Sequence, residues 1–72
     1  MKIEIKDDEQ TLVITNEELD NANFVDLELY DDEAKDKDNP RGYITEFTAP
    51  LEELVVAVNC FWNIKKNAEK RL

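Results

Sequence analysis

Apolar and polar residues alternate near the start of the chain, which is the pattern of a half-buried β-strand. In residues 2–6, Ile3 and Ile5 alternate with charged residues. A polar break follows, and residues 11–15 are apolar and β-branched, as expected of a hairpin partner whose Leu12 and Ile14 lie beside the two isoleucines. The first 15 residues therefore predict two paired strands.

A clearer alternation begins at Phe24. Val25, Leu27 and Leu29 alternate with polar residues, so a strand over 24–30 has one aliphatic face and one largely acidic face. The polar segment 31–41 predicts a mobile loop.

Residues 43–48 predict a fourth strand. Tyr43, Thr45 and Phe47 fall on one side of it, and the two aromatic rings favour that side as the buried one. Between the second and third strands, Thr15 to Glu18 has the form of a capping box, which predicts a short helical turn through Asn21.

The last third of the chain has helical periodicity. A helix from about Pro50 to Lys70 is predicted, with Thr48 or Ala49 as its N-cap and proline in its first turn. Its apolar stripe is wide, consisting of Leu51, Leu54, Val55, Val58, Phe61 and Trp62, with Ala57, Ile64 and Ala68 on one flank.

Four strands followed by one helix predict a single α+β domain over residues 1–72, a two-layer ββββα fold with a mostly antiparallel sheet and the C-terminal helix packed on one face. The predicted inward set on the sheet is Ile3, Ile5, Leu12, Ile14, Val25, Leu27 and Leu29. The opposite, open face would carry Lys2, Glu4, Lys6, Val13, Asp26, Glu28 and Glu46.

Composition argues against catalysis. The chain has no histidine and no serine, so the commonest neutral-pH base and a common nucleophile are missing. Cys60 has apolar neighbours on the predicted helix and is interpreted as a structural thiol. Gly42 is the single glycine, which excludes a Gly-rich phosphate loop. We expect no enzymatic activity and no cofactor.

A metal site is not expected either. The carboxylates of residues 31–38 are suitable calcium ligands, but a twelve-residue EF-hand frame from Asp36 places Arg41 where glycine is needed and Phe47 where a bidentate glutamate is needed. A solvated run of charge is the simpler interpretation.

The charge is strongly asymmetric. The net charge is −9, and thirteen acids against two lysines lie between Asp7 and Asp38, whereas residues 65–72 carry four bases and one acid. The basic end suits the C-terminus of a helix. Because a net-acidic surface repels phosphate and no aromatic residues interleave with a basic stripe, we expect no direct binding of nucleic acid.

The acidic surface favours protein recognition. Rows of carboxylates present a nucleic-acid-like negative potential to a basic partner, such as a nucleic-acid-binding protein, and small inhibitors from phages or mobile elements use this kind of mimicry. The same charge would also serve solubility alone. The predicted partner-binding residues are Asp26, Glu28, Asp31, Asp32, Glu33, Asp36 and Asp38.

The alternative hypothesis is a self-associating assembly module. A 72-residue chain buries only a small core, so dimerisation is a natural route to stability. The apolar helix residues outside the main stripe predict the homodimer contact: Val56, Cys60 and Ile64.

The chain has one cysteine, no apolar leader at its start and no run of about 20 apolar residues. These features predict a cytoplasmic setting without a membrane span.

Overall fold

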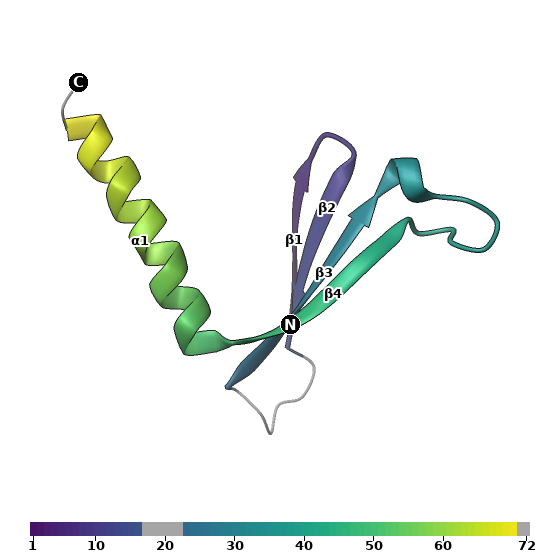
Figure 1. Ribbon diagram of the computed structural model, residues 1–72, viewed down its shortest axis with the longest axis horizontal. Helices are drawn as coiled ribbons and strands as arrows, with labels where there is room; N and C mark the ends of the chain where they lie inside the picture. Colours follow the sequence, from purple (N-terminus) through teal and green to yellow (C-terminus); the bar gives the residue numbers. More distant parts are fainter. Residues whose placement is uncertain (17–22, 71–72) are drawn as a thin grey trace.

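The computed structural model describes residues 1–16 and 23–70 and contains one antiparallel sheet and one long helix (Figure 1). The strands are β1 (Lys2–Asp7), β2 (Gln10–Thr15), β3 (Phe24–Asp31) and β4 (Tyr43–Pro50), and they lie in the order β1-β2-β3-β4. Helix α1 (Leu51–Lys70) follows β4 directly. The α+β class and the ββββα order are confirmed, with helix and strand ends shifted by one or two residues. The helical turn predicted through Asn21 falls largely on residues 17–22, outside the described residues.

The strand register separates two faces of the sheet, as the alternation predicted. Ile3 pairs with Ile14, which pairs with Leu27, so these three side chains share one face. The same parity defines the apolar sheet face, made of Ile3, Ile5, Leu12, Ile14, Val25, Leu27, Leu29, Thr45, Phe47 and Ala49. The polar sheet face carries the intervening residues, including Lys2, Glu4, Lys6, Val13, Asp26, Glu28 and Glu46.

Tyr43 does not lie on the side of β4 that was predicted for it. The register of β3 and β4 shifts between Leu29 and Tyr30, so that Leu29 pairs with Thr45 while Tyr30 pairs with Tyr43, leaving Ile44 as an extra residue. The bulge moves Tyr43 to the polar face, where its ring meets the Tyr30 ring edge-on at 5.9 Å. The prediction that Tyr43 shares a side with Phe47 was therefore wrong.

The segment after β3, predicted to be a mobile loop, begins with a short 3-10 turn, η1 (Asp32–Ala34). The irregular part of the loop is therefore shorter than predicted. The side-chain oxygen of Asp31 accepts a hydrogen bond from the Glu33 amide at the start of this turn. The side-chain amide of Asn39 donates to the carbonyls of Ala34 and Tyr43, so the loop carries a defined set of hydrogen bonds.

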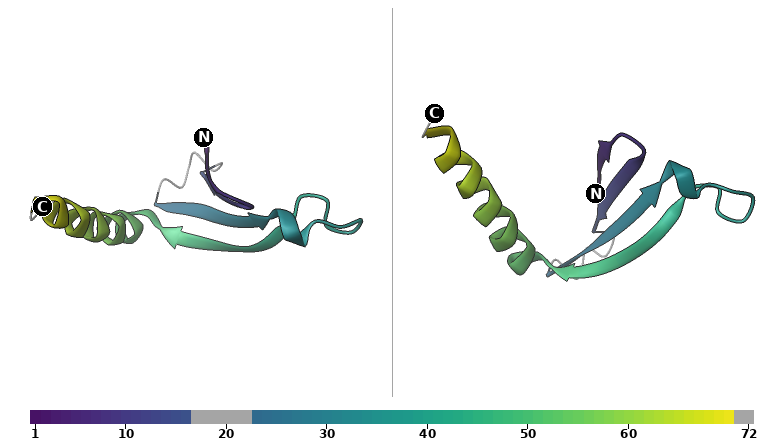
Figure 2. Two further views of the ribbon diagram at one scale, coloured as in Figure 1. Left: turned by 90° about the horizontal axis from the view of Figure 1, so that it is seen from above. Right: turned by 45° about the horizontal axis from the view of Figure 1, so that its top comes forward.

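The position of α1 differs from the expectation of a helix packed on one face of the sheet. The helix and the sheet diverge from their junction like the arms of a V, and only the first turns of α1 lie near the strands (Figures 1 and 2). No residue separates Pro50, the end of β4, from Leu51, the start of α1. The Leu51 amide donates to the Asn23 carbonyl at 2.8 Å, which fixes the start of the helix against β3. With no connecting loop, the helix leaves the sheet at the junction and does not turn back across it.

The buried core is correspondingly small. Among the described residues, the buried apolar side chains are Val13, Val25, Tyr30 and Ala49. The Cα radius of gyration is 15.4 Å, whereas a compact domain of this length has about 11 Å. The single chain therefore leaves much of its apolar surface without cover.

Candidate interaction surfaces

Carboxylates gather at one end of the sheet, where the β1–β2 turn meets the loop after β3. The Asp32 amide donates to the Glu9 carbonyl at 2.9 Å, and the Gln10 side chain donates to Asp31. These contacts bring together six acidic residues, which we call the acidic end: Asp7, Asp8, Glu9, Asp31, Asp32 and Glu33. Three of them, on the β1–β2 turn, were absent from the predicted partner-binding set.

The predicted partner-binding residues do not form one continuous surface. Asp26 and Glu28 lie on the polar sheet face, Asp31 ends β3, and the other four lie in the segment that follows it. Asp26 accepts a hydrogen bond from the Thr48 hydroxyl at 2.7 Å, and Glu28 accepts one from the Tyr30 hydroxyl. These two carboxylates therefore support the sheet locally.

Several carboxylates of the loop also have local structural roles. Asp31 caps η1, and one Asp36 oxygen accepts the amides of Asp38 and Asn39, both at 2.8 Å. Asp32 forms an ion pair with Lys35 at 2.9 Å. A sequence can indicate such caps, because an aspartate side chain often accepts a hydrogen bond from the backbone N–H two or three residues later in a turn.

Glu9, Asp31 and Glu33 bring carboxylate oxygens within 4.8 Å of one another. The pKa of Glu9 is raised above 4.5, first by its hydrogen bond with Glu33, then by partial desolvation and by the charges of Asp31 and Asp32. Such a set offers oxygen ligands of the type hard cations accept. Glu9 and Glu33 are exposed and Asp31 is half-buried, so water solvates the cluster.

We expect Glu9→Gln to stabilise the fold slightly at neutral pH. Because the pKa of Glu9 is raised in the folded state, its contribution to stability is fully present below the ordinary pKa of 4.5 and is lost as pH rises through the raised value. The variant should therefore unfold at a higher temperature than the wild type at about pH 7 and at the same temperature at about pH 3.5. Asp38→Asn, at another exposed carboxylate, is the matched control, and an equal gain there would contradict the local explanation.

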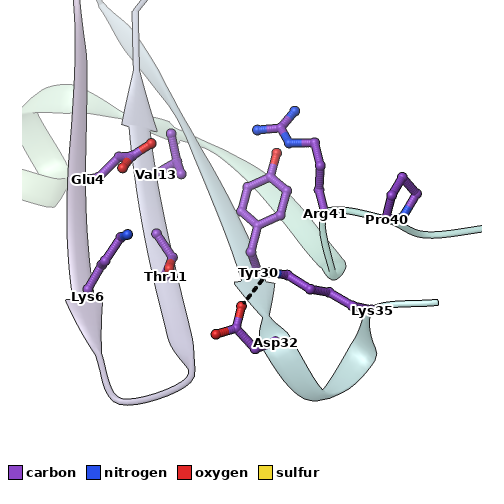
Figure 3. A pocket seen from close by; sticks show the side chains of 9 residues that line it. All are labelled: Glu4, Lys6, Thr11, Val13, Tyr30, Asp32, Lys35, Pro40 and Arg41. Atoms are coloured by element: carbon purple, nitrogen blue, oxygen red, sulfur yellow. Dashed lines mark ion pairs between the residues drawn. The ribbon is translucent and has the colours of Figure 1, made fainter.

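A shallow groove of about 290 Å³ lies on the polar sheet face (Figure 3). It is lined by side chains of both charges, namely Glu4, Lys6, Thr11, Val13, Tyr30, Asp32, Lys35, Pro40 and Arg41. The Arg41 guanidinium lies 4.7 Å from the centre of the Tyr30 ring, and Figure 3 shows both side chains beside the groove. The cations in this region mean that the polar sheet face is not uniformly negative.

Tyr30 is the best-covered large side chain of that face. Its hydroxyl donates to Glu28, and this hydrogen bond is the main reason that the pKa of Tyr30 lies above 10.0, with Arg41 acting in the opposite direction. Val13 is 3% exposed, although it was predicted on the open face. No pattern in the sequence signals this cover, because the residues paired with Val13 on the neighbouring strands are Glu4 and Glu28.

The helix exposes its main apolar stripe. Phe61 is 73% exposed and Trp62 is 50% exposed, although both were predicted to be buried against the sheet. The predicted dimer-contact residues Val56, Cys60 and Ile64 are exposed as well. The uncovered surface is therefore larger than the flank that the sequence indicated.

Near the junction, the stripe and the apolar sheet face form an open apolar groove of about 380 Å³. Ile14 and Val25 line it from the sheet, and the helix contributes Leu51, Leu54, Val55, Val58 and Asn59. The stripe thus points to the same side of the molecule as the apolar sheet face, and the two surfaces diverge beyond the groove.

Comparison of the chain with protein-family models, with curated proteins and with solved structures finds no match. In the part of the chain that the structure describes, no helix combines the length and the apolar character needed to cross a membrane.

Proposed function

We propose that the protein is a self-associating interaction module, which works through its surfaces and in more than one copy. The observation that carries this proposal is the uncovered apolar stripe of α1, which diverges from an apolar sheet face on which Ile3, Ile5 and Phe47 are also exposed. Large contiguous apolar surfaces of this kind mark sites of protein association.

The amount of exposed surface supports the same proposal. The chain of 8.4 kDa exposes 6302 Å², whereas a folded monomer of that mass exposes about 4,600 Å². The excess is about 1,700 Å² per chain, and two chains that covered it would bury about 3,400 Å². That area falls in the range of obligate homodimers.

The direct test is the mass of the protein in solution. Sedimentation equilibrium should give at least twice the chain mass of 8.4 kDa at micromolar concentration, at high salt as well as at low salt. Phe61→Glu places a charge in the exposed apolar stripe of α1 and should shift the equilibrium toward the single chain. A wild-type protein that sediments as one chain at every concentration would exclude self-association.

A second function is favoured by the carboxylates of the acidic end. We propose that this end, together with Asp36 and Asp38, binds a basic protein surface. The raised pKa of Glu9 reflects in part the negative potential of its neighbours there, which is also the potential that a nucleic-acid-binding groove recognises. A nucleic-acid-binding protein is therefore the proposed partner class, and inhibition by mimicry is the proposed outcome.

We expect Glu33→Lys combined with Asp38→Lys to abolish this binding, because the change reverses charge at exposed positions. The measurement is capture of partner proteins from nuclease-treated lysate at low and high salt. Captured proteins should elute as salt rises and should be displaced by added double-stranded DNA. Glu46→Lys combined with Glu52→Lys is the matched control for net charge. Capture that survives the first pair of changes would rule out the acidic end as the site.

A further inference from the structure

We propose that helix α1 of one copy lies on the apolar sheet face of a second copy and that the exchange is reciprocal. In this arrangement the helix runs from the junction end of the partner's sheet to its acidic end. The inference rests on the proposed self-association and specifies which surfaces meet.

The first argument is the junction between β4 and α1. Pro50 ends the strand and Leu51 begins the helix, so no loop exists to bring α1 back over its own sheet. Short connections of this kind favour exchange of an element between copies, because the partner's element can reach a surface that the chain's own element cannot. The apolar sheet face therefore needs a helix from elsewhere, and a second copy supplies one.

The second argument is the match between the two uncovered surfaces. Phe61 on the helix is 73% exposed and Phe47 on the apolar sheet face is 65% exposed. The 20 residues of α1 extend over about 30 Å, while the eight residues of β3 and of β4 extend over about 26 Å. One helix is thus long enough to cover one sheet face.

The third argument is that positive charge on the helix lies at the same distance from the junction as negative charge on the sheet. The apolar sheet face ends at the row of Asp7, Gln10 and Asp31, which are paired across three strands. From Val25 to Asp31 the sheet extends about 20 Å. From Leu51 to Lys65 the helix extends about 21 Å. A helix aligned at the junction end therefore brings Lys65 to the acidic row.

The cations of the helix end cannot reach that row within one chain. The end of α1 with Lys65, Lys66 and Lys70 and the acidic end of the sheet lie at the far tips of the two diverging arms (Figure 1). Lys65 and Lys66 each lie about 5 Å from the centre of the Trp62 ring, so positive charge flanks the last aromatic residue of the stripe. Exchange pairs this charge with the partner's carboxylates.

The test uses two charge insertions, Phe61→Glu in the stripe and Phe47→Glu in the apolar sheet face. Phe61 and Phe47 are exposed in the single chain, so the substitutions leave its own packing largely intact. Each variant alone should lose dimerisation, with the dissociation constant raised at least about thirtyfold. A mixture of the two should contain some heterodimer, because the intact helix of one variant fits the intact sheet face of the other in one of the two reciprocal contacts.

Matched controls place the same charge on surfaces that the exchange leaves free. Val56→Glu lies on the flank of α1 outside the stripe, and Phe24→Glu lies on the polar sheet face. Both should retain the wild-type mass in sedimentation equilibrium. If circular dichroism shows that a test variant unfolds, Val58→Glu and Ile5→Glu repeat the comparison at positions 57% and 53% exposed.

The outcomes separate this inference from the self-association on which it rests. A wild-type monomer would remove both. A dimer that persists with Phe61→Glu or with Phe47→Glu would overturn the exchange and leave self-association standing. Loss of the dimer with Val56→Glu while Phe61→Glu remains dimeric would instead place the contact on the helix flank, between two helices.

A charge swap tests the direction of the helix. Lys65→Glu should weaken the dimer at low salt, and adding Asp7→Lys in the same chain should restore it, because each copy then presents the opposite pair of charges. Failure of the second change to restore affinity would contradict the proposed alignment of Lys65 with the acidic row.

Discussion

Replacement of Gly42 by alanine should lower the free energy of unfolding by at least about 2 kcal/mol. Gly42 has φ of 77°, in the left-handed region that residues with a Cβ rarely adopt. A Cβ built there would lie 2.1 Å from the Asp31 carbonyl oxygen, which is a backbone atom that cannot move alone. The Asp31 amide donates to the Gly42 carbonyl at 2.8 Å, so a shift of Gly42 also disturbs this hydrogen bond.

Urea unfolding followed by circular dichroism measures this loss. Lys37→Ala, in the same loop, is the matched control and should change stability by less than about 0.5 kcal/mol. Since a small domain has only about 5 kcal/mol in total, a loss of this size removes a large part of its stability and should clearly lower the urea midpoint. A variant as stable as the wild type would mean that the loop can take another path while keeping Asp31 in the sheet.

The strands were predictable because the alternation of apolar and polar residues along each segment agrees with the pairing of residues between neighbouring strands. Ile3, Ile14 and Leu27 stand at apolar positions of separate segments, and an antiparallel sheet with short turns places them on one face. The bulge beside Tyr30 was not predictable, because the bulged segment contains no glycine or proline to mark the extra residue. One inserted residue is enough to move Tyr43 to the opposite face.

The position of the helix was not predictable from its amphipathic pattern. The stripe from Leu51 to Trp62 shows that this face needs cover, but a pattern cannot show whether the cover belongs to the same chain. The deciding feature is the length of the connection after Pro50, and strand and helix boundaries are uncertain by a few residues when only the sequence is known. With an uncertainty of that size, the sequence does not show whether β4 and α1 are joined directly or by a loop long enough for the helix to fold back onto the sheet.

The acidic end was predicted in part. Residues 31–38 stand together in the sequence and were found for that reason, whereas Glu9 joins them only through the pairing of β1 with β2 and of β2 with β3. The local hydrogen bonds of Asp31 and Asp36 show that carboxylates in an acidic run can serve the turn as well as a partner. Charge counting along the chain does not separate these two roles.

The second large effect concerns the whole assembly, namely that the unfolding temperature should depend on protein concentration. When two folded chains dissociate as they unfold, dilution favours the unfolded state by mass action. With about 0.7 kcal/mol of unfolding enthalpy per residue in each of two 72-residue chains, a tenfold dilution should lower the midpoint by about 5 °C. Scanning calorimetry over a hundredfold range of concentration should therefore show a shift of about 10 °C.

The Phe61→Glu variant is the internal control for this shift. It keeps the sheet and its small core of Val13, Val25, Tyr30 and Ala49, but it loses the cover supplied by the partner's helix. Its midpoint should be lower than that of the wild type and should not change with concentration, because a single chain unfolds without dissociation. A wild-type midpoint that is equally independent of concentration would mean that the exposed stripe and sheet face contribute nothing to stability through a second copy. In that case the sheet would have to be stable on its own with only these few buried side chains, which is far less burial than a domain of this length usually achieves.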